Sequence, residues 1–313
     1  MDDSLVWFDG RPVAVSEAMV SIDSETALRG ANVFEGIRGY SRAGNGLGFL
    51  ALRQHLRRLM TSAMLLGIDH PYTVDGFVTA IGSLLAAQGA AETWHDLYVR
   101  PSICVVHGRL PTEPDYRVVD YVAVIDQPRT DLYKPATAIV SRWRRPADGP
   151  LPAQIKAGGA YLAFRLPLLE RARAGVDAVV LLNENGMVAE AEGAAVCIIR
   201  DGTLSSPPAR EGGLRSLTRK IVFDLARDAG IDVRTEPIRH SEIYEADGIF
   251  LAGTMCELMP LVVVDGVALD TIDSPLYRRI ADGFDRLRSE GGPTAGWALE
   301  FIGREVRGGN YEA

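Results

Sequence analysis

Hydrophobic and polar positions along the first part of the chain predict short strands that flank two helices. The segment Leu5–Val13 predicts a hairpin with Asp9 and Gly10 at its turn. Between residues 52 and 66, apolar side chains recur every three or four positions, which indicates an amphipathic helix, and a second helix is expected at about 74–88. Further strands are expected at Val33–Tyr40, Leu97–Val106 and Val118–Ile125.

The pattern breaks at residues 126–135 (DQPRTDLYKP), which favours a linker between domains. After it we expect a strand at Thr137–Ser141, a helix at Ala160–Ala174 that Pro167 kinks or interrupts, and a helix at Leu217–Ala229 capped by Gly230. The strands between these helices are punctuated by turns at Asn185-Gly186, Asp201-Gly202 and Asp265-Gly266.

These elements predict an α/β (α+β) fold with two domains. The predicted division is a small N-terminal α/β domain at 1–125, a linker at 126–137 and a larger C-terminal domain at 138–313, richer in antiparallel hairpins. The sequence contains no internal repeat and no low-complexity segment.

Composition narrows the classes of partner. The net charge of −8 disfavours nucleic acid and anionic membranes, and no apolar run approaches the roughly 20 residues that span a bilayer. The acidic start Met1-Asp2-Asp3-Ser4 lacks the features of a signal peptide. Three widely spaced cysteines predict reduced thiols in a cytoplasmic protein, and five scattered histidines predict no metal site.

Lysine is scarce in this chain. Only Lys134, Lys156 and Lys220 occur among 33 basic residues. Arginine stays protonated and forms no imine, so a lysine in such a chain draws attention to chemistry that arginine cannot perform. Lys134 is expected in a loop and Lys220 on an amphipathic helix, so an ordinary place on the surface explains both. Lys156 differs, because it precedes Gly158 and Gly159 at the predicted end of a strand.

Two glycine-containing segments are candidate anion sites. Gly212-Gly213 leads into the helix that begins near Leu217, where free N–H groups and the Thr218 hydroxyl favour a phosphate. A strand ending at Gly253-Thr254 offers another hydroxyl. An ordinary N-cap at Ser216 and a simple turn explain these two segments equally well.

Two carboxylates complete the candidate chemistry. Glu190 and Glu192 fall on one face of a predicted strand because strand side chains alternate. A solvated strand face is the more common reason for such a pair. Arg58, on the first predicted helix, could be a surface charge like its neighbour Arg57.

Seven segments, taken together and in order, resemble the class IV aminotransferases of fold type IV, and most closely the branched-chain amino acid aminotransferases. The similarity runs over essentially the whole chain. The segments are VFEGIR (33–38), HLRRL (55–59), YVRP (98–101), KAGGAYL (156–162), VAEAEG (188–193), LRSLTR (214–219) and AGTMCELMP (252–260).

The resemblance implies pyridoxal 5′-phosphate (PLP) as cofactor, a homodimer, and an active site between two domains. Lys156 would be the catalytic residue, holding PLP as a Schiff base and then carrying a proton. Glu190 would pair with the pyridine nitrogen and Tyr161 with the ring oxygen. The phosphate would be held by Arg58, Leu217, Thr218 and Thr254. The substrate side would include Phe34, Arg38, Tyr98 and Arg100.

The chain departs from the family pattern at several positions. Polar residues common after the glutamate motif are replaced by Ala194 and Ala195, and a tyrosine common before the VFEG strand is replaced by Arg29. Met255 should narrow the pocket, and Arg109 lies in an altered loop beside His107. Extra arginines at the substrate side would favour a polar or acidic substrate over leucine or isoleucine.

The resemblance implies transfer of an amino group between an L-amino acid, branched-chain-like or more polar, and a 2-keto acid such as 2-oxoglutarate. A D-amino-acid transaminase or an aminodeoxychorismate lyase would share the lysine, the glutamate and the phosphate residues. A non-catalytic binding protein of the same fold is the second alternative.

Overall fold

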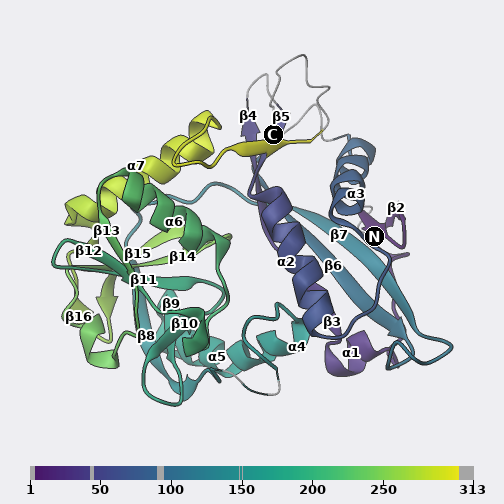
Figure 1. Cartoon of the computed structure of the whole chain (residues 1–313), viewed down its shortest axis with the longest axis horizontal. Helices are drawn as coiled ribbons and strands as arrows, with labels where there is room; N and C mark the ends of the chain where they lie inside the picture. The colour runs from purple at the N-terminus through teal and green to yellow at the C-terminus, as the bar shows by residue number, and fades with distance from the viewer. Residues whose placement is uncertain (1–3, 43–45, 90–94, 148, 150, 303–313) are drawn as a thin grey trace.

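Two β-sheets, joined by an extended linker, form the two halves of the computed structural model (Figure 1). The structure describes residues 4–42, 46–89, 95–147, 149 and 151–302. Within these residues, no helix has the length and apolar character needed to cross a membrane.

The first sheet is antiparallel throughout, in the order β17-β5-β4-β6-β7-β1-β2, with β3 paired to β6. Alternating buried positions of its strands form one wall of the first core. Its strands are β1 (Leu5–Phe8), β2 (Arg11–Ala14), β3 (Asn32–Phe34), β4 (Ile37–Arg42), β5 (Gly46–Leu50), β6 (Leu97–His107), β7 (Arg117–Asp126) and β17 (Leu299–Phe301).

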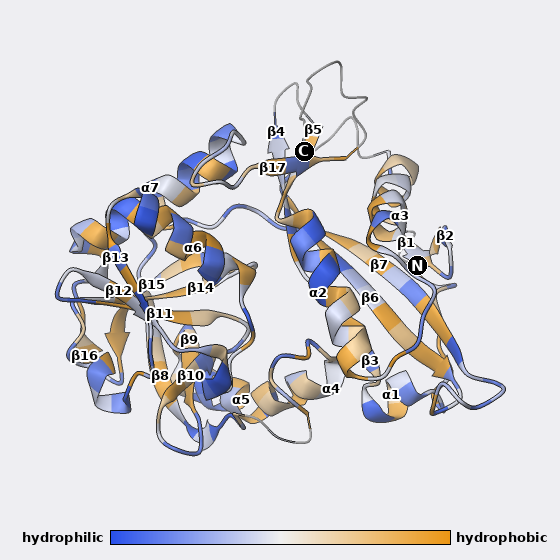
Figure 2. Cartoon of the chain, in the orientation of Figure 1, coloured by the Kyte–Doolittle hydropathy of each residue, from blue (hydrophilic) through white to orange (hydrophobic). Residues whose placement is uncertain are grey.

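Helices α2 (Leu52–Leu65) and α3 (Val74–Ala87) complete this core. Their apolar residues recur at helical spacing, so each helix buries one face, including Leu56 and Ile81. The short α1 (Glu25–Arg29) packs against β6. Figure 2 shows apolar residues along β6 and β7 and polar residues along much of the outer side of α7.

The second sheet is mixed, in the order β10-β9-β8-β15-β14-β11-β12-β13, with β16 beside β15. Only β8–β9, β8–β15 and β12–β13 are parallel pairs among the strands described. Its strands are β8 (Ala136–Arg144), β9 (Ala178–Leu182), β10 (Val188–Ala191), β11 (Ala195–Arg200), β12 (Thr203–Ser206), β13 (Asp232–Thr235), β14 (Gly248–Gly253), β15 (Glu257–Val264) and β16 (Val267–Ala268).

Apolar clusters cover both faces of the second sheet. On one face, α6 and α7 pack against β11 and β14, and this cluster also takes in Tyr40 from the first half. The helices of this half are α4 (Gly158–Tyr161), α5 (Arg165–Ala174), α6 (Leu217–Asp228) and α7 (Pro275–Glu290); single 3-10 turns lie at Leu162–Phe164, Ala209–Glu211, His240–Ile243 and Thr271–Asp273.

The structure refines several predicted elements. The strand expected at 33–40 is interrupted after Phe34, and the helix expected at 160–174 is divided into α4, a 3-10 turn and α5. Pro167 lies in the first turn of α5, where its missing N–H breaks no helical hydrogen bond. β7 runs through Asp126 and β8 begins at Ala136, so the extended link is shorter than 126–137.

The last described strand corrects one part of the predicted domain division. β17 pairs with β5, so residues 299–301 join the first sheet although they were expected in the second domain. Ile155, Ala157 and Ala160 also pack in the core of the first half. The segment that carries Lys156 therefore lies against both halves. The outermost residues of both predicted domains, 1–3 and 303–313, lie outside the described residues.

Candidate active site

A cavity of about 360 Å³ lies between the two halves of the chain. Its walls come from β3, α2 and β6 on one side and from α4, the end of β10, the start of α6 and the β14–β15 turn on the other. A cleft of this size with a few charged groups is typical of a small-molecule site.

Lys156 projects its amine into this cavity between two aromatic rings. Its Nζ donates a hydrogen bond of 2.5 Å to Tyr161 Oη and lies 4.9 Å from the ring centroids of both Phe34 and Tyr161. The backbone of Lys156 is held from the first half, because Phe34 N donates to its carbonyl at 3.0 Å. Ser62 Oγ accepts from its N–H at 3.2 Å.

The glycines after Lys156 permit a close approach between the halves of the chain. A Cβ on Gly158 would lie 2.6 Å from Asn32 Oδ1, and one on Gly30 would lie 2.7 Å from the backbone nitrogen of Gly159. Gly159 N in turn donates to Gly30 O at 3.2 Å. A side chain at either crowded position would push Lys156 away from the first half.

Glu190 is buried at the far side of the cavity with a donor on each oxygen. Arg145 Nε donates to Oε1 at 2.9 Å, and the N–H of Leu214 donates to Oε2 at 3.0 Å. Burial raises the pKa of Glu190, while Arg145 and the Leu214 N–H oppose that shift. This carboxylate is therefore held rigidly, in a dry environment, facing the cavity.

Glu192 also lines the cavity but has other partners. Arg171 Nη1 donates to its Oε1 at 2.6 Å, and Val179 N donates to Oε2 at 2.9 Å. β10 ends at Ala191, so Glu192 lies in the turn that follows. The two carboxylates share the cavity wall but are fixed separately.

The start of α6 and the β14–β15 turn form an anion-binding corner. Ser216 caps the helix by accepting from Arg219 N at 3.1 Å, which leaves the first N–H groups, those of Leu217 and Thr218, without partners inside the helix. Thr254, with its hydroxyl, lines the same cavity. The macrodipole of α6 adds partial positive charge at this corner.

Arg58 reaches the cavity from α2 already paired. Its Nε and Nη2 donate to the two oxygens of Glu35 at 2.6 and 2.9 Å, and Nη1 donates to Arg215 O at 2.8 Å. His55 Nδ1 lies 2.8 Å from Glu35 Oε2. Burial alone would raise the pKa of Glu35, but Arg58 and His55 hold it well below its usual range. Glu35 therefore stays ionised and fixes Arg58.

The substrate side of the cavity contains Phe34, Tyr98, Arg100 and Met255. The Arg100 guanidinium carbon lies 4.2 Å from the centroid of the Phe34 ring. Burial raises the pKa of Tyr98 to about 12, so its phenol stays protonated at neutral pH. A Cβ on Gly36 would overlap the Tyr98 side chain, so glycine is required there.

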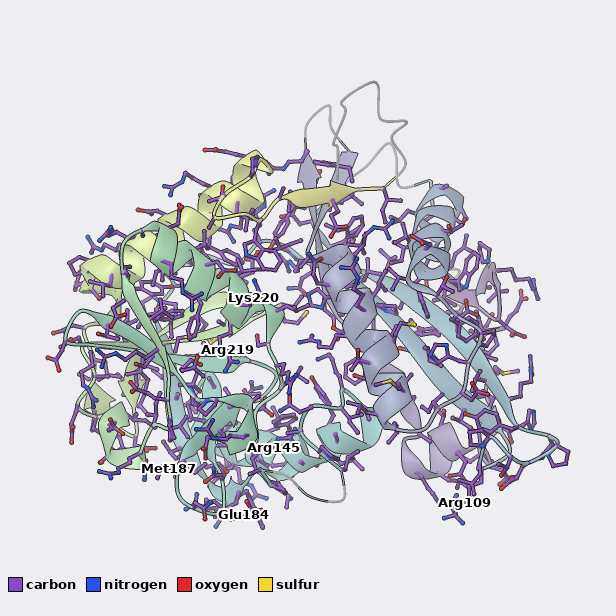
Figure 3. The ribbon with its side chains drawn as sticks, viewed as in Figure 1. Arg109, Arg145, Glu184, Met187, Arg219 and Lys220 are labelled. Carbon is purple, nitrogen blue, oxygen red and sulfur yellow. The ribbon has the colours of Figure 1, made fainter. Side chains whose placement is uncertain are left out.

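Three arginines predicted at the substrate side do not line this cavity in the described chain. Arg38 is 2% exposed and donates from Nη2 to Pro128 O at 3.0 Å, because the linker covers it. Arg29 is paired with Glu25 on α1. Arg109 lies in the β6–β7 loop and does not line the cavity, and Figure 3 shows it well away from the labelled cavity residue Arg145. These three arginines therefore contribute no positive charge to the lining of the cavity in their own chain.

Sequence reasoning missed two residues that hold the predicted ones. Glu35 orients Arg58, and Arg145 orients Glu190. Glu35 lies inside the quoted VFEGIR segment, so its carboxylate next to Gly36 was a visible signal. Arg145 stands in an arginine-rich run (Trp143-Arg144-Arg145-Pro146) with no pattern to distinguish it.

Comparisons with known proteins identify the family. The family model described as "Amino-transferase class IV" matches residues 32–264. The chain belongs to the class IV aminotransferases, and it is accordingly an enzyme, a transaminase.

Named relatives point to one branch of that family. A probable branched-chain-amino-acid aminotransferase of Aquifex aeolicus (strain VF5) is 32% identical over 306 residues, 96% of this chain and 92% of the relative. The crystal structure of a branched-chain aminotransferase from Thermoproteus uzoniensis with norvaline has a TM-score of 0.84 and 33% identity, covering 91% of this chain and 94% of that one.

A third similar protein was solved in its PLP form. The branched-chain amino acid aminotransferase of Thermobaculum terrenum, as the holo form, has a TM-score of 0.83 and 29% identity, covering 92% of this chain and 94% of that one. These similarities extend over both halves of the chain and confirm the predicted fold type.

Proposed function

We propose that this enzyme moves the amino group of branched-chain L-amino acids to a 2-keto acid such as 2-oxoglutarate, using PLP held in the cavity between its two halves. One observation carries the proposal. The Lys156 amine shares a single cavity with a buried carboxylate, Glu190, and with the anion-binding start of α6. These are the three groups that a phosphorylated pyridine aldehyde requires.

The donor set fits the cofactor group by group. Lys156 is the amine for the aldehyde, Tyr161 is the phenol for the ring oxygen, and Glu190 is the carboxylate for the ring nitrogen. Arg58, the N–H groups of Leu217 and Thr218, and Thr254 would hold the phosphate. When bound, PLP supplies a carbonyl that takes up the amino group and a ring that accepts electrons.

The chain's own residues do the remaining work. Lys156 Nζ would be the base that moves a proton at the substrate's α-carbon. Tyr161 Oη, 2.5 Å away, orients that nitrogen. Glu35 keeps Arg58 charged and aimed at the phosphate corner, so part of the binding geometry exists before any ligand arrives.

Arg100 is the residue proposed to bind the substrate carboxylate. Of the arginines that line the cavity, Arg58 is paired with Glu35 and Arg145 with Glu190. Within the described part of the chain, no carboxylate lies at ion-pair distance from Arg100. A free guanidinium beside Phe34 suits a carboxylate attached to an aliphatic chain.

The lining of the cavity favours aliphatic donors over the polar or acidic substrate considered from the sequence. Phe34, Ile155, Phe164 and Met255 contribute apolar wall, and Arg38, one of the arginines invoked for a polar substrate, is buried under the linker. The named relatives, all branched-chain aminotransferases, do not favour a D-amino-acid transaminase, an aminodeoxychorismate lyase or a non-catalytic protein.

A panel of amino donors tests this function. Leucine, isoleucine and valine, in L and D forms, are compared with D-alanine, L-glutamate, L-phenylalanine and L-serine by the loss of PLP absorbance in a single half-reaction. We expect the L-branched donors to give the highest kcat/KM. A preference for D-alanine, or a polar donor better than leucine, would contradict the proposed substrate class.

We further propose a cytoplasmic homodimer. All three cysteines are free thiols, as in reducing compartments. Exposed apolar side chains, among them Ile22, Leu28 on α1 and Leu110 in the β6–β7 loop, offer a surface for a second copy. A monomer with full activity, seen by sedimentation at the assay concentration, would contradict the dimer.

A further inference from the structure

Arg145 is a buried arginine that lies directly behind the carboxylate assigned to the ring nitrogen. It follows β8, and its side chain is 8% exposed. Its Nε donates to Glu190 Oε1 at 2.9 Å, and it lines the same cavity. Beyond orienting Glu190, Arg145 has no role in the proposed function.

The arginine is held so that it cannot easily leave Glu190. Its guanidinium carbon lies 4.8 Å from the centroid of the Phe164 ring, and its backbone N–H donates to Leu182 O at 2.9 Å. A weaker contact of 3.5 Å joins Nη1 to Ala160 O. Figure 3 places Arg145 in the second half of the chain, near α5.

This pairing changes what Glu190 can do with a proton. One of its oxygens receives the arginine and the other receives the Leu214 N–H. Both donors stabilise the carboxylate over the carboxylic acid. A nearby arginine typically weakens the proton affinity of a carboxylate by about ten- to a thousandfold. Compared with an unpaired Glu190, a proton shared with a ring nitrogen would therefore lie closer to the nitrogen.

We propose that Arg145 is a positioning residue that keeps the shared proton on the ring nitrogen of PLP by making Glu190 a weaker base than it would be if buried without this partner. The inference rests on the proposed function, because it assumes that Glu190 faces that nitrogen. Glu190 by itself would not keep the ring nitrogen protonated. If it were buried without a partner, Glu190 would take the proton, and the ring would lose its positive charge.

The test compares charge at position 145 while keeping a hydrogen-bond donor. Arg145→Gln removes the charge, and Arg145→Lys retains it. Arg171→Gln is the matched control, because it removes the arginine from the neighbouring cavity carboxylate, Glu192. Holoenzyme is reconstituted with PLP labelled with ¹⁵N in the ring, and the ¹⁵N chemical shift reports whether the nitrogen is protonated.

We expect a protonated nitrogen in the wild type, in Arg145→Lys and in Arg171→Gln, and a shift toward the unprotonated value in Arg145→Gln. Glu190→Gln supplies the reference for loss of the carboxylate. If Glu190→Gln leaves the ¹⁵N shift unchanged, the assigned role of Glu190 fails. If Glu190→Gln changes it and Arg145→Gln does not, the inference about Arg145 alone is overturned.

A second measurement does not require bound cofactor. In the PLP-free protein, the carboxyl carbon of Glu190 is titrated by ¹³C NMR. We expect Arg145→Gln to increase the proton affinity of Glu190 at least tenfold relative to Arg145→Lys. Equal titration in the two variants would overturn the inference even if the glutamine variant no longer holds PLP.

Discussion

The amine of Lys156 and the phenol of Tyr161, five residues apart on either side of the start of α4, lie 2.5 Å from each other. The short helix makes this contact possible, since its single turn brings the tyrosine back toward the lysine. The Tyr161 ring is itself fixed by edge contacts with Phe34 at 4.8 Å and Phe164 at 5.3 Å. The Lys156 amine thus has one defined orientation.

Replacing Lys156 by alanine should abolish transamination and leave the fold intact, because no arginine can replace the amine. The checks are turnover and the lysine labelled by borohydride in the wild-type holoenzyme. Lys220→Ala is the control, since Lys220 is exposed and paired with Asp224. Turnover in Lys156→Ala, or label on Lys134 or Lys220, would contradict the assignment.

Tyr161→Phe should keep the aromatic packing and lose only the hydroxyl. A hydrogen bond to a charged group is worth about 1.5–3 kcal/mol, so kcat should fall by about ten- to a hundredfold while PLP still binds. Both quantities are measured, with Tyr133→Phe as a control because that phenol bonds Asp282 at the surface. An unchanged kcat in Tyr161→Phe would show that its hydroxyl does not orient the amine.

The two cavity carboxylates should differ in importance. Glu190→Gln should bind PLP but lower kcat by about 10²–10³, the usual cost of losing one positioned electrostatic group. Glu192→Gln should cost much less, because Glu192 lies in the turn after β10, is held by Arg171 and the Val179 N–H, and is not the carboxylate assigned to the ring nitrogen. Single-turnover rates are measured for both variants. A larger loss of rate in Glu192→Gln would mean that Glu192, and not Glu190, is the carboxylate that pairs with the ring nitrogen.

Ionised Glu35 should make the free energy of unfolding decrease at acidic pH. Its folded-state pKa lies below its ordinary value of 4.5, since Arg58 and His55 outweigh burial. Its contribution is therefore present above pH 4.5 and is lost as the pH falls. Glu35→Gln should cost about 3–5 kcal/mol of unfolding free energy at pH 7, and the gap from wild type should narrow as the pH falls further.

Urea unfolding from about pH 7 down to about pH 3 measures this gap across the window in which Glu35 loses its advantage. Glu25→Gln is the matched control, because Glu25 pairs with a half-exposed arginine on α1 and should change stability by less than about 1 kcal/mol. A gap that stays constant with pH would mean that Glu35 is not ionised in the fold.

Substitution of Arg38 should affect stability, whereas substitution of Arg100 should affect substrate binding. Arg38→Met should lower the unfolding free energy by about 1–3 kcal/mol, because it removes a buried hydrogen bond to Pro128 and a charge 3.7 Å from Glu257, and KM should hardly change. Arg100→Met should raise KM for leucine about ten- to a hundredfold, with normal stability. An equal rise in KM for both variants would mean that Arg38 also contributes to substrate binding.

Local pattern was sufficient for much of the fold. α2, α3 and α6 appear close to their predicted bounds because each has an apolar face at helical spacing, which depends on neighbours a few residues away. The hairpin turns after Asp9, Asp201 and Asp265 follow from local chemistry as well, since each pairs an aspartate with a glycine at positive φ.

The fold type and the class of chemistry were also contained in the sequence, as seven short segments in a fixed order. Lys156, Glu190, Thr218 and Thr254 were named from those segments, and all four line one cavity. Spacing along the chain identified these positions but not their partners.

Only the tertiary structure decided which arginines line the cavity and which are buried elsewhere. Arg38 and Arg100 lie on adjacent strands, yet the linker covers the first and the cavity exposes the second. Arg145 and Glu190 are 45 residues apart, and β17 joins β5 from the other end of the chain. A long charged side chain is placed by whatever packs over it, and those contacts come from segments too distant in sequence for any local pattern to reveal.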